Sequence, residues 1–180
     1  MARQRLPLAL AACAACLFGP AAVASACDNA SSAPTRATIA DARSATLCLI
    51  NEARAKRGLG RLDSAGSLAR AAAAHSRDMA ANDFFSHDSP GGSTPKSRIA
   101  GTGYLSGASS YAVGETIAWG SGDLASPSAI VRSWLRSAGH RAILLDSHYD
   151  DVGIGIALGS PGGGGGATFT GDFGKRGQGH

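Results

Sequence analysis

The sequence predicts an α+β domain or a layered α/β/α domain, because its helical patterns come first and a β-hairpin comes last. Apolar residues recur at helical spacing over residues 38–57 and again from 63 to about 81. Near the C-terminus, residues 152–158 alternate between bulky and small side chains, and a glycine-rich turn over 159–166 leads to a second β pattern over 167–173. We therefore expect a short, mostly antiparallel sheet that is covered by helices and ends in a C-terminal hairpin.

The strand predicted over 152–158 has one bulky face and one very small face. Its bulky residues are Val152, Ile154, Ile156 and Leu158, and the small residues between them are Gly153, Gly155 and Ala157. A face without large side chains allows a helix or another backbone to approach closely.

In the second helix, His75 shares an apolar stripe with three other residues. The helix is expected to begin at a cap formed by Asp63 or Ser64. The stripe consists of Leu68, Ala72, His75 and Met79. A histidine on an apolar helical face is usually a hydrogen-bonded core residue, so we favour that interpretation over a ligand role.

A short helix is predicted to begin after Ser126, which can cap its first turn, with Pro127 at the first helical position. Its apolar stripe consists of Ile130, Val131, Trp134 and Leu135. Gly139 is expected to end this helix in a left-handed conformation, which would place His140 just past the end. Residues 141–145 are expected to add one further turn.

The chain between the second helix and Ser126 is expected to be mostly irregular. Residues 82–92 are rich in turn formers, residues 98–100 are expected to form a short helix, and the Ser-, Gly- and Tyr-rich residues 104–113 are predicted to form a loop. A short strand is predicted over 115–119. Residues 120–125 resemble a dinucleotide fingerprint, but no second parallel strand follows, so we interpret them as a turn.

Residues 1–26 have the pattern of a secretory signal peptide. A basic start is followed by an apolar run, and the run ends at Ala24-Ser25-Ala26 or at Ala22-Val23-Ala24, both of which suit a signal peptidase. No stop-transfer segment follows, so we expect a secreted, extracellular protein without a transmembrane span. A surface lipoprotein anchored through Cys27 is the minor alternative.

The mature chain is expected to consist of a lead-in over 27–37, a domain over 38–174 and a short tail over 175–180. Without the two arginines of the leader, the net charge falls from +4 to +2, which is too low and too evenly spread to predict nucleic-acid binding. In an exported protein, the remaining Cys27 and Cys48 are expected to form a disulfide that contributes about 3 kcal/mol. We expect a monomer.

Three polar residues lie where the chain is predicted to reverse direction, each next to large apolar residues: His87, Glu115 and His140. Two imidazoles and a carboxylate suit zinc or another divalent cation, or general acid–base chemistry, if they converge. The chain has no His-Glu-x-x-His, Gly-x-Ser-x-Gly or Walker A motif, which argues against a zincin, an α/β-hydrolase or a P-loop enzyme.

Six short motifs resemble, in order, those of the CAP superfamily of cysteine-rich secretory, antigen and pathogenesis-related proteins, and above all its bacterial extracellular, SCP-like branch. They are Asn51-Glu-Ala-Arg54, His75-Ser-Arg-Asp-Met79, Phe85-Ser-His87, Gly114-Glu115-Thr-Ile117, Ser133-Trp134 through Gly139-His140-Arg141, and Val152-Gly153-Ile-Gly155. The resemblance covers about residues 45–174. It implies a three-layer α-β-α sandwich whose cavity is lined by two histidines and one or two acids, here His87, Glu115 and His140.

The chain departs from the family pattern at several positions of the implied cavity. Thr116 replaces the Asn of Gly-Glu-Asn, and Ser137 lies where many eukaryotic members carry a second cavity Glu. In the motifs of the bacterial branch, Ala138 replaces a proline and Ile143 replaces an asparagine. The resemblance then implies zinc with three protein ligands and one open position, and the reduced acid count makes tight metal binding less favourable.

We expect an extracellular binding module whose cavity takes a small lipid, a sterol-like molecule or a peptide, with or without a divalent metal. The alternative is a metal-assisted hydrolase of a peptide or wall polymer, in which His87, Glu115 and His140 hold a metal-bound water. A secreted scaffold without a functional cavity is a third interpretation. Binding is favoured because the sequence provides no clear nucleophile or oxyanion hole.

Overall fold

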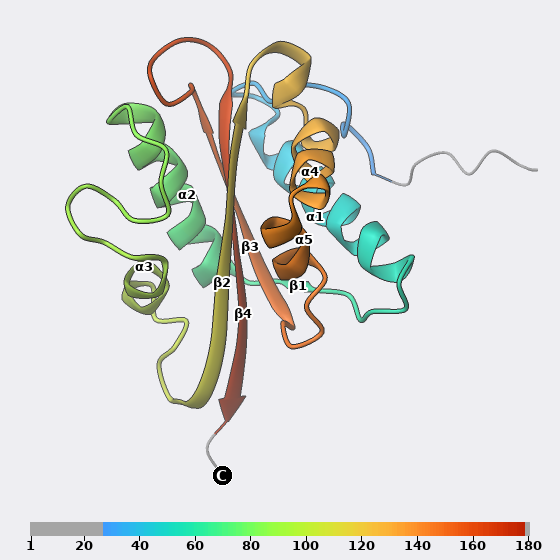
Figure 1. Cartoon of the computed structure of the whole chain (residues 1–180), viewed down its shortest axis with the longest axis vertical. Helices are drawn as coiled ribbons and strands as arrows, with labels where there is room; N and C mark the ends of the chain where they lie inside the picture. The colour runs from blue at the N-terminus through green and yellow to red at the C-terminus, as the bar shows by residue number, and fades with distance from the viewer. Residues whose placement is uncertain (1–26, 179–180) are drawn as a thin grey trace, which may run out of the picture.

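A four-stranded sheet separates two helical layers in the computed structural model, which describes residues 27–178 (Figure 1). The strands are β1 (Asp63–Ser64), β2 (Ala108–Gly120), β3 (Asp151–Leu158) and β4 (Ala167–Gln178). Their order in the sheet is β1-β3-β4-β2, with β1 parallel to β3 and the other pairs antiparallel. The predicted α-β-α sandwich with a mostly antiparallel sheet and a C-terminal hairpin is therefore confirmed.

The helices cover both faces of the sheet. They are α1 (Ile39–Ala55), α2 (Gly66–Ala81), α3 (Pro95–Gly101), α4 (Pro127–Arg136) and α5 (Ala138–Leu144), with a short 3₁₀ turn at Gly122–Ala125. Helices α2 and α3 lie on one face, and α1, α4 and α5 lie on the other (Figure 1). The predicted first and second helices and the turn at 120–125 are therefore present.

The small face of β3 lets α2 touch the sheet, as the alternation predicted. A Cβ atom added to Gly153 would lie 2.0 Å from the backbone nitrogen of Ala69. One added to Gly155 would lie 2.1 Å from the carbonyl carbon of Ala72. Backbone therefore packs against backbone here, and no side chain fits between the two elements.

The opposite face of the sheet carries the larger apolar core. Trp134 of α4 is fully buried, and its indole N–H donates to the carbonyl of Ile117 in β2 at 3.1 Å. Arg54 of α1 is also buried, and its guanidinium donates to the carbonyls of Gly60, Leu144 and Asp146. These donors join α1 and α4 to the loops and to the sheet, because buried carbonyls need hydrogen-bond partners.

The helix predicted from Ser126 to Gly139 is interrupted earlier than expected. Ser126 caps α4 with its hydroxyl, but α4 ends at Arg136, and Ser137 is extended, with φ −76° and ψ 125°. Because Ser137 makes the turn, Gly139 needs no left-handed conformation and lies inside the first turn of α5. The prediction that His140 follows a helix end is therefore wrong, since His140 lies within α5.

The sheet extends further than the sequence indicated. Residues 108–113, predicted to be a loop, belong to β2, and residues 175–178, predicted to be a tail, belong to β4, because these two segments pair with each other. The pairing is at the edge of the sheet, where polar side chains are tolerated, so the segments lack apolar alternation. Asp63 and Ser64 form β1 rather than a cap, and Ala65 precedes α2 without a side-chain hydrogen bond.

The predicted disulfide joins Cys27 to Cys48 of α1, with a Cα–Cα distance of 5.6 Å. It fastens the lead-in to the first helix, as expected. The predicted signal peptide, residues 1–26, lies outside the described residues. Across residues 27–178, no helix combines the length and apolar character needed to cross a membrane.

The contact between α2 and β3 generates a stability prediction. Gly155→Ala places a methyl group in the backbone of α2, so we expect a loss of about 2 kcal/mol or more in the free energy of unfolding. Gly139→Ala is the matched control, because a Cβ there meets no atom within 4 Å, and we expect a change of less than about 1 kcal/mol. Urea denaturation measures both, and a Gly155→Ala protein as stable as the control would contradict the packing.

Candidate functional site

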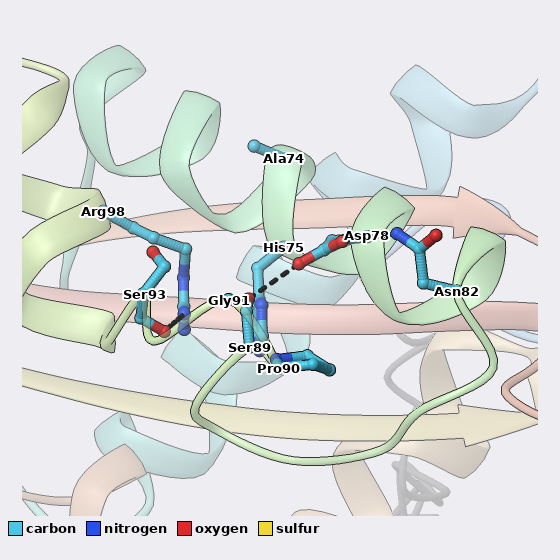
Figure 2. A pocket seen from close by; sticks show the side chains of 9 residues that line it. All are labelled: Ala74, His75, Asp78, Asn82, Ser89, Pro90, Gly91, Ser93 and Arg98. Atoms are coloured by element: carbon cyan, nitrogen blue, oxygen red, sulfur yellow. Dashed lines mark hydrogen bonds between the residues drawn. The ribbon is translucent and has the colours of Figure 1, made fainter.

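A pocket of about 670 Å³ opens between α2, α3 and the loop 82–94 that joins them (Figure 2). It is lined by Ala74, His75, Asp78, Asn82, Ser89, Pro90, Gly91, Ser93 and Arg98. Six of these side chains are polar. The predicted cavity residues His87, Glu115, Ser137 and His140 do not line it.

Asp78 fixes the loop over one side of this pocket. Its carboxylate accepts from the Ser89 hydroxyl at 2.6 Å and from the Asn82 amide at 2.7 Å. The hydrogen bond from Ser89 is the largest influence and lowers the pKa of Asp78, and together with the bond from Asn82 it outweighs the opposing effect of burial. Asp78 is therefore ionised at neutral pH.

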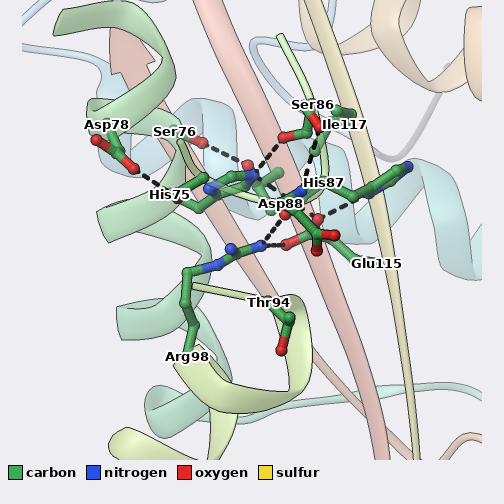
Figure 3. Close-up of polar contacts among 12 residues, drawn as sticks. His75, Ser76, Asp78, Ser86, His87, Asp88, Thr94, Arg98, Glu115 and Ile117 are labelled. Atoms are coloured by element: carbon green, nitrogen blue, oxygen red, sulfur yellow. Dashed lines mark hydrogen bonds and ion pairs between the residues drawn. The ribbon is translucent and has the colours of Figure 1, made fainter. Parts of the chain in front are cut away.

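Behind the pocket, one buried carboxylate connects three elements (Figure 3). Glu115 lies on β2, and its Oε1 is 2.8 Å from Nδ1 of His87 in the loop 82–94. Its Oε2 accepts from Nη2 of Arg98 in α3 at 2.6 Å. Nε2 of His75 in α2 lies 3.8 Å from Oε1. Two predicted site residues, His87 and Glu115, are thus in direct contact, and Arg98 and His75 link them to the pocket.

The partners of Glu115 keep it ionised. Burial alone would raise the pKa of Glu115, but the hydrogen bond from His87 and the charge and hydrogen bond of Arg98 outweigh burial, and the pKa lies below its usual value. In turn, the hydrogen bond to Glu115 raises the pKa of His87 against partial burial. The His87 ring is about half exposed, so its Nε2 remains open to a ligand.

His75 is buried, as predicted, and is held by the backbone. Its Nε2 donates to the carbonyl of Ser86 at 2.9 Å, which leaves Nδ1 without a partner among the described residues. Burial lowers the pKa of His75, although Glu115 acts in the opposite direction, so the ring is neutral near pH 7. The helical spacing identified this residue as buried, but its place beside Glu115 and the pocket was missed.

Asp172 of β4 is a second buried acid, and no local sequence pattern predicts its role. It lies opposite Glu115 in the β2–β4 register. As a carboxylate it would have no hydrogen-bond donor for either oxygen within the described chain. Burial is the main cause that raises its pKa well above the usual value, and the charge of Glu115 acts in the same direction. Asp172 is therefore a neutral acid beside the ionised Glu115.

His140 and Ser137 lie at the junction of α4 and α5, in the other helical layer. The His140 side chain is half-buried, and no hydrogen bond joins it to another described residue. Burial lowers the pKa of His140, and the nearby His87 charge lowers it further. Ser137 lies at the break between the two helices, where its backbone turns the chain. Of the predicted cluster, the structure therefore joins His87 to Glu115 and leaves His140 apart from the carboxylate.

The donor set does not fit the implied three-ligand zinc site. In the part of the chain that the structure describes, the only three potential ligand atoms within 4.8 Å of one another belong to Cys27, Cys48 and Glu52, and both sulfurs are in the disulfide. Both oxygens of Glu115 are occupied, by His87 and Arg98. Around His87, no three potential ligand atoms of the described residues lie close enough together to hold a cation, and catalytic zinc requires three protein ligands.

A family profile described as "CAP: Cysteine-rich secretory protein family" matches residues 47–173, which is more than half of the chain. The chain belongs to the CAP family. The CAP domain is 38% identical over 110 residues to the uncharacterized membrane protein YlbC of Bacillus subtilis, and 33% identical over 107 residues to the uncharacterized protein YkwD of the same organism. These matches span 61% and 59% of this chain but only 30% and 39% of the relatives.

Solved structures share the fold of the CAP domain. An extracellular protein from Bacillus anthracis that contains an SCP domain is 27% identical, with a TM-score of 0.64 over 78% of this chain and 43% of that one. An outer surface protein from Borrelia burgdorferi is 24% identical, with a TM-score of 0.61 over 73% of this chain and 90% of that one. The resemblance to the bacterial SCP-like branch is confirmed.

The pair formed by His87 and Glu115 predicts a pH effect. Because the hydrogen bond to Glu115 raises the pKa of His87, its stabilising effect is complete below the ordinary value of 6.5 and is lost as the pH rises through the raised pKa. We expect Glu115→Gln to shift the His87 titration, followed by NMR, to lower pH, because the variant loses the charge of the hydrogen-bond acceptor. Glu52→Gln, which removes a carboxylate outside this network, is the control. An unchanged titration in Glu115→Gln would contradict the pairing.

The neutral state of Asp172 predicts that an amide is preferred at this position. A raised pKa costs the folded protein stability once the pH exceeds the ordinary carboxyl value of 3.8, because only the unfolded chain then ionises freely. We expect Asp172→Asn to raise the melting temperature at pH 7 by about 3 °C or more, and to have less effect as the pH falls towards 4. Calorimetry at both pH values checks the sign. If Asp172→Asn destabilises the protein equally at pH 7 and pH 4, Asp172 is not a neutral acid in the folded protein.

Proposed function

We propose that this CAP domain is an extracellular binding module that holds a short peptide in the pocket between α2, α3 and the loop 82–94. The pocket itself is the observation that carries this proposal. Its volume of about 670 Å³ falls within the range typical of small-ligand sites, about 300–1,000 Å³. Export agrees with the leader pattern at 1–26 and with the extracellular SCP-domain protein among the similar structures.

The lining favours a peptide over a lipid or a sterol. Its hydroxyl, amide, carboxylate and imidazole groups can pair with the N–H and C=O groups of a peptide backbone. A lipid or sterol would instead bury these groups without partners, which costs free energy. We therefore place the lipid and sterol-like ligands that the family resemblance suggested behind a peptide.

The charges at the pocket favour a ligand with an amino group. Arg98 contributes little free positive charge, because Glu115 pairs with it at 2.6 Å. His75 is neutral near pH 7, whereas Asp78 is ionised. The pocket therefore presents one uncompensated carboxylate, which suits the N-terminal ammonium group of a peptide.

A hydrolase is the second candidate, and the pair of His87 and Glu115 supports it. A carboxylate that accepts from Nδ1 orients an imidazole so that its exposed Nε2 can act as a general base. The metal-assisted form, with His87, Glu115 and His140 as ligands, has weaker support, since both carboxylate oxygens of Glu115 are occupied. We rank binding first.

We further propose a monomeric, secreted protein, with anchoring through Cys27 as the alternative.

Calorimetric titration with trialanine tests the binding proposal. We expect saturable binding that weakens by about tenfold in Asp78→Asn and when the peptide is N-acetylated, because either change removes the ion pair. Asp83→Asn is the matched control: it makes the same charge change five residues further along, in the loop 82–94 and outside the pocket lining, and Asn tolerates the left-handed φ of 53° there.

Three outcomes would overturn the binding proposal. Equal affinity in Asp78→Asn and Asp83→Asn would remove the role of the pocket carboxylate. Binding of cholesterol or phosphatidylcholine in place of trialanine would favour the lipid alternative. Cleavage of trialanine that is lost in His87→Ala would favour the hydrolase, and mass spectrometry of the titration mixture detects it.

A further inference from the structure

We propose that a groove along β3, between α1 and α2, binds an extended acidic peptide segment of another protein. Two hollows of about 480 Å³ and 280 Å³ make up this groove, and Arg43 lines both of them. One is lined by Arg36, Ile39, Arg43, Arg77, Ala80, Ala81, Ile156, Ala157 and Leu158. The other is lined by Arg43, Ser44, Leu47, Cys48, Arg61, Ser64, Ala69, Val152 and Ile154.

The groove concentrates positive charge that nothing around it neutralises. Four arginines line it: Arg36, Arg43, Arg61 and Arg77. Neither lining includes an acidic residue. Within residues 27–178, none of these guanidinium groups forms an ion pair or donates a hydrogen bond. The Nε of Arg43 is buried and still lacks a partner. Buried polar donors are nearly always paired, so Arg43 indicates a missing acceptor.

The shape of the groove suits an extended chain. β1 pairs with β3 only at Asp151 and Val152, so in the described part of the chain β3 continues to Leu158 with no further strand on that side. The stretch from Val152 to Leu158 spans about 20 Å at the rise of a strand, which corresponds to about six extended residues. Arginines line this length from both helices, with Arg43 on α1 and Arg77 on α2.

The lining identifies the occupant as a peptide. A phosphate or a single carboxylate would engage one or two arginines, whereas a linear chain of carboxylates can engage all four. Apolar groups such as Ile39 and Leu47 line the same hollows as the arginines, and they suit the aliphatic side chains of a peptide. Extended peptides that lie along a strand with no further strand beside it are a recurrent recognition mode.

This groove is independent of the pocket proposed above for a short peptide. His75 and Asp78 line the pocket, whereas Arg77 and Ala81 of the same helix line the groove. The two sites therefore use different faces of α2 and carry opposite charge. Either one can fail experimentally without affecting the other.

Fluorescence anisotropy with a labelled peptide of about eight alternating Glu and Val residues tests the proposal, using the protein with its disulfide formed. We expect saturable binding that weakens by about tenfold or more in Arg36→Glu/Arg77→Glu, both of which are exposed residues and so should not prevent folding. Arg132→Glu/Arg136→Glu on the exposed side of α4 makes the same charge change outside the groove, and we expect less than about twofold weakening. Arg43→Gln, made separately, should also weaken binding by about fivefold.

The outcomes separate a specific groove from general attraction. Equal weakening in the two charge-reversed pairs would show that only net charge matters and would overturn the proposal. If inorganic polyphosphate binds as tightly as the peptide, the groove recognises polyanions in general and the peptide proposal is overturned. A peptide of alternating Lys and Val that binds equally well, or no saturable binding by the acidic peptide, would also overturn it.

Discussion

The buried carboxylate of Glu115 is the interaction on which the candidate site depends. An ionised carboxylate inside a protein is costly unless charged or hydrogen-bonding partners surround it, and removing one partner leaves an uncompensated charge. Its two oxygens face His87 from the loop 82–94 and Arg98 from α3. The loop and the short helix are therefore fixed to the sheet through this carboxylate, in addition to the apolar packing of Ile99 in α3. The pocket exists because they are held there.

The second constraint is the absence of side chains on one face of β3. Gly153 and Gly155 allow the α2 backbone to touch the sheet, and this contact places the polar groups of α2 at sheet level. Ser76 donates to Thr170 on β4 at 2.9 Å, and His75 lies 3.8 Å from Glu115. A bulkier strand would hold α2 further away, and the helix could not provide a wall of the pocket. The two glycines, which in the sequence indicate only a small packing face, therefore also determine the geometry of the site.

The sequence predicted the parts of the molecule that depend on local patterns. Helical periodicity, the small face at Gly153 and Gly155, and the pairing of Cys27 with Cys48 are all visible along the chain. The pairing of β2 with the end of β4 was missed, because its strength lies in hydrogen bonds between distant and mostly polar segments. The break at Ser137 was missed for a related reason: an extended serine can separate two helices as effectively as a left-handed glycine, and the residue types do not distinguish them. The residues of the site also divide into those with a local signal and those without one. His87 and Glu115 were identified by their position in the chain and by the family resemblance. Arg98 and Asp172 have no local signal and matter only because the fold places both beside Glu115.

Charge that is evenly spread along a sequence need not be evenly spread in space. Without its predicted leader the chain has a small net charge, and its arginines occur throughout the sequence, which gave no reason to expect a basic surface. Folding brings Arg36, Arg43, Arg61 and Arg77 to one groove, while the acids stay outside its lining. On the other face of α2, Asp78 remains the one uncompensated charge at the pocket because Glu115 neutralises Arg98. The two faces of one helix therefore attract groups of opposite charge, a property that the net charge conceals.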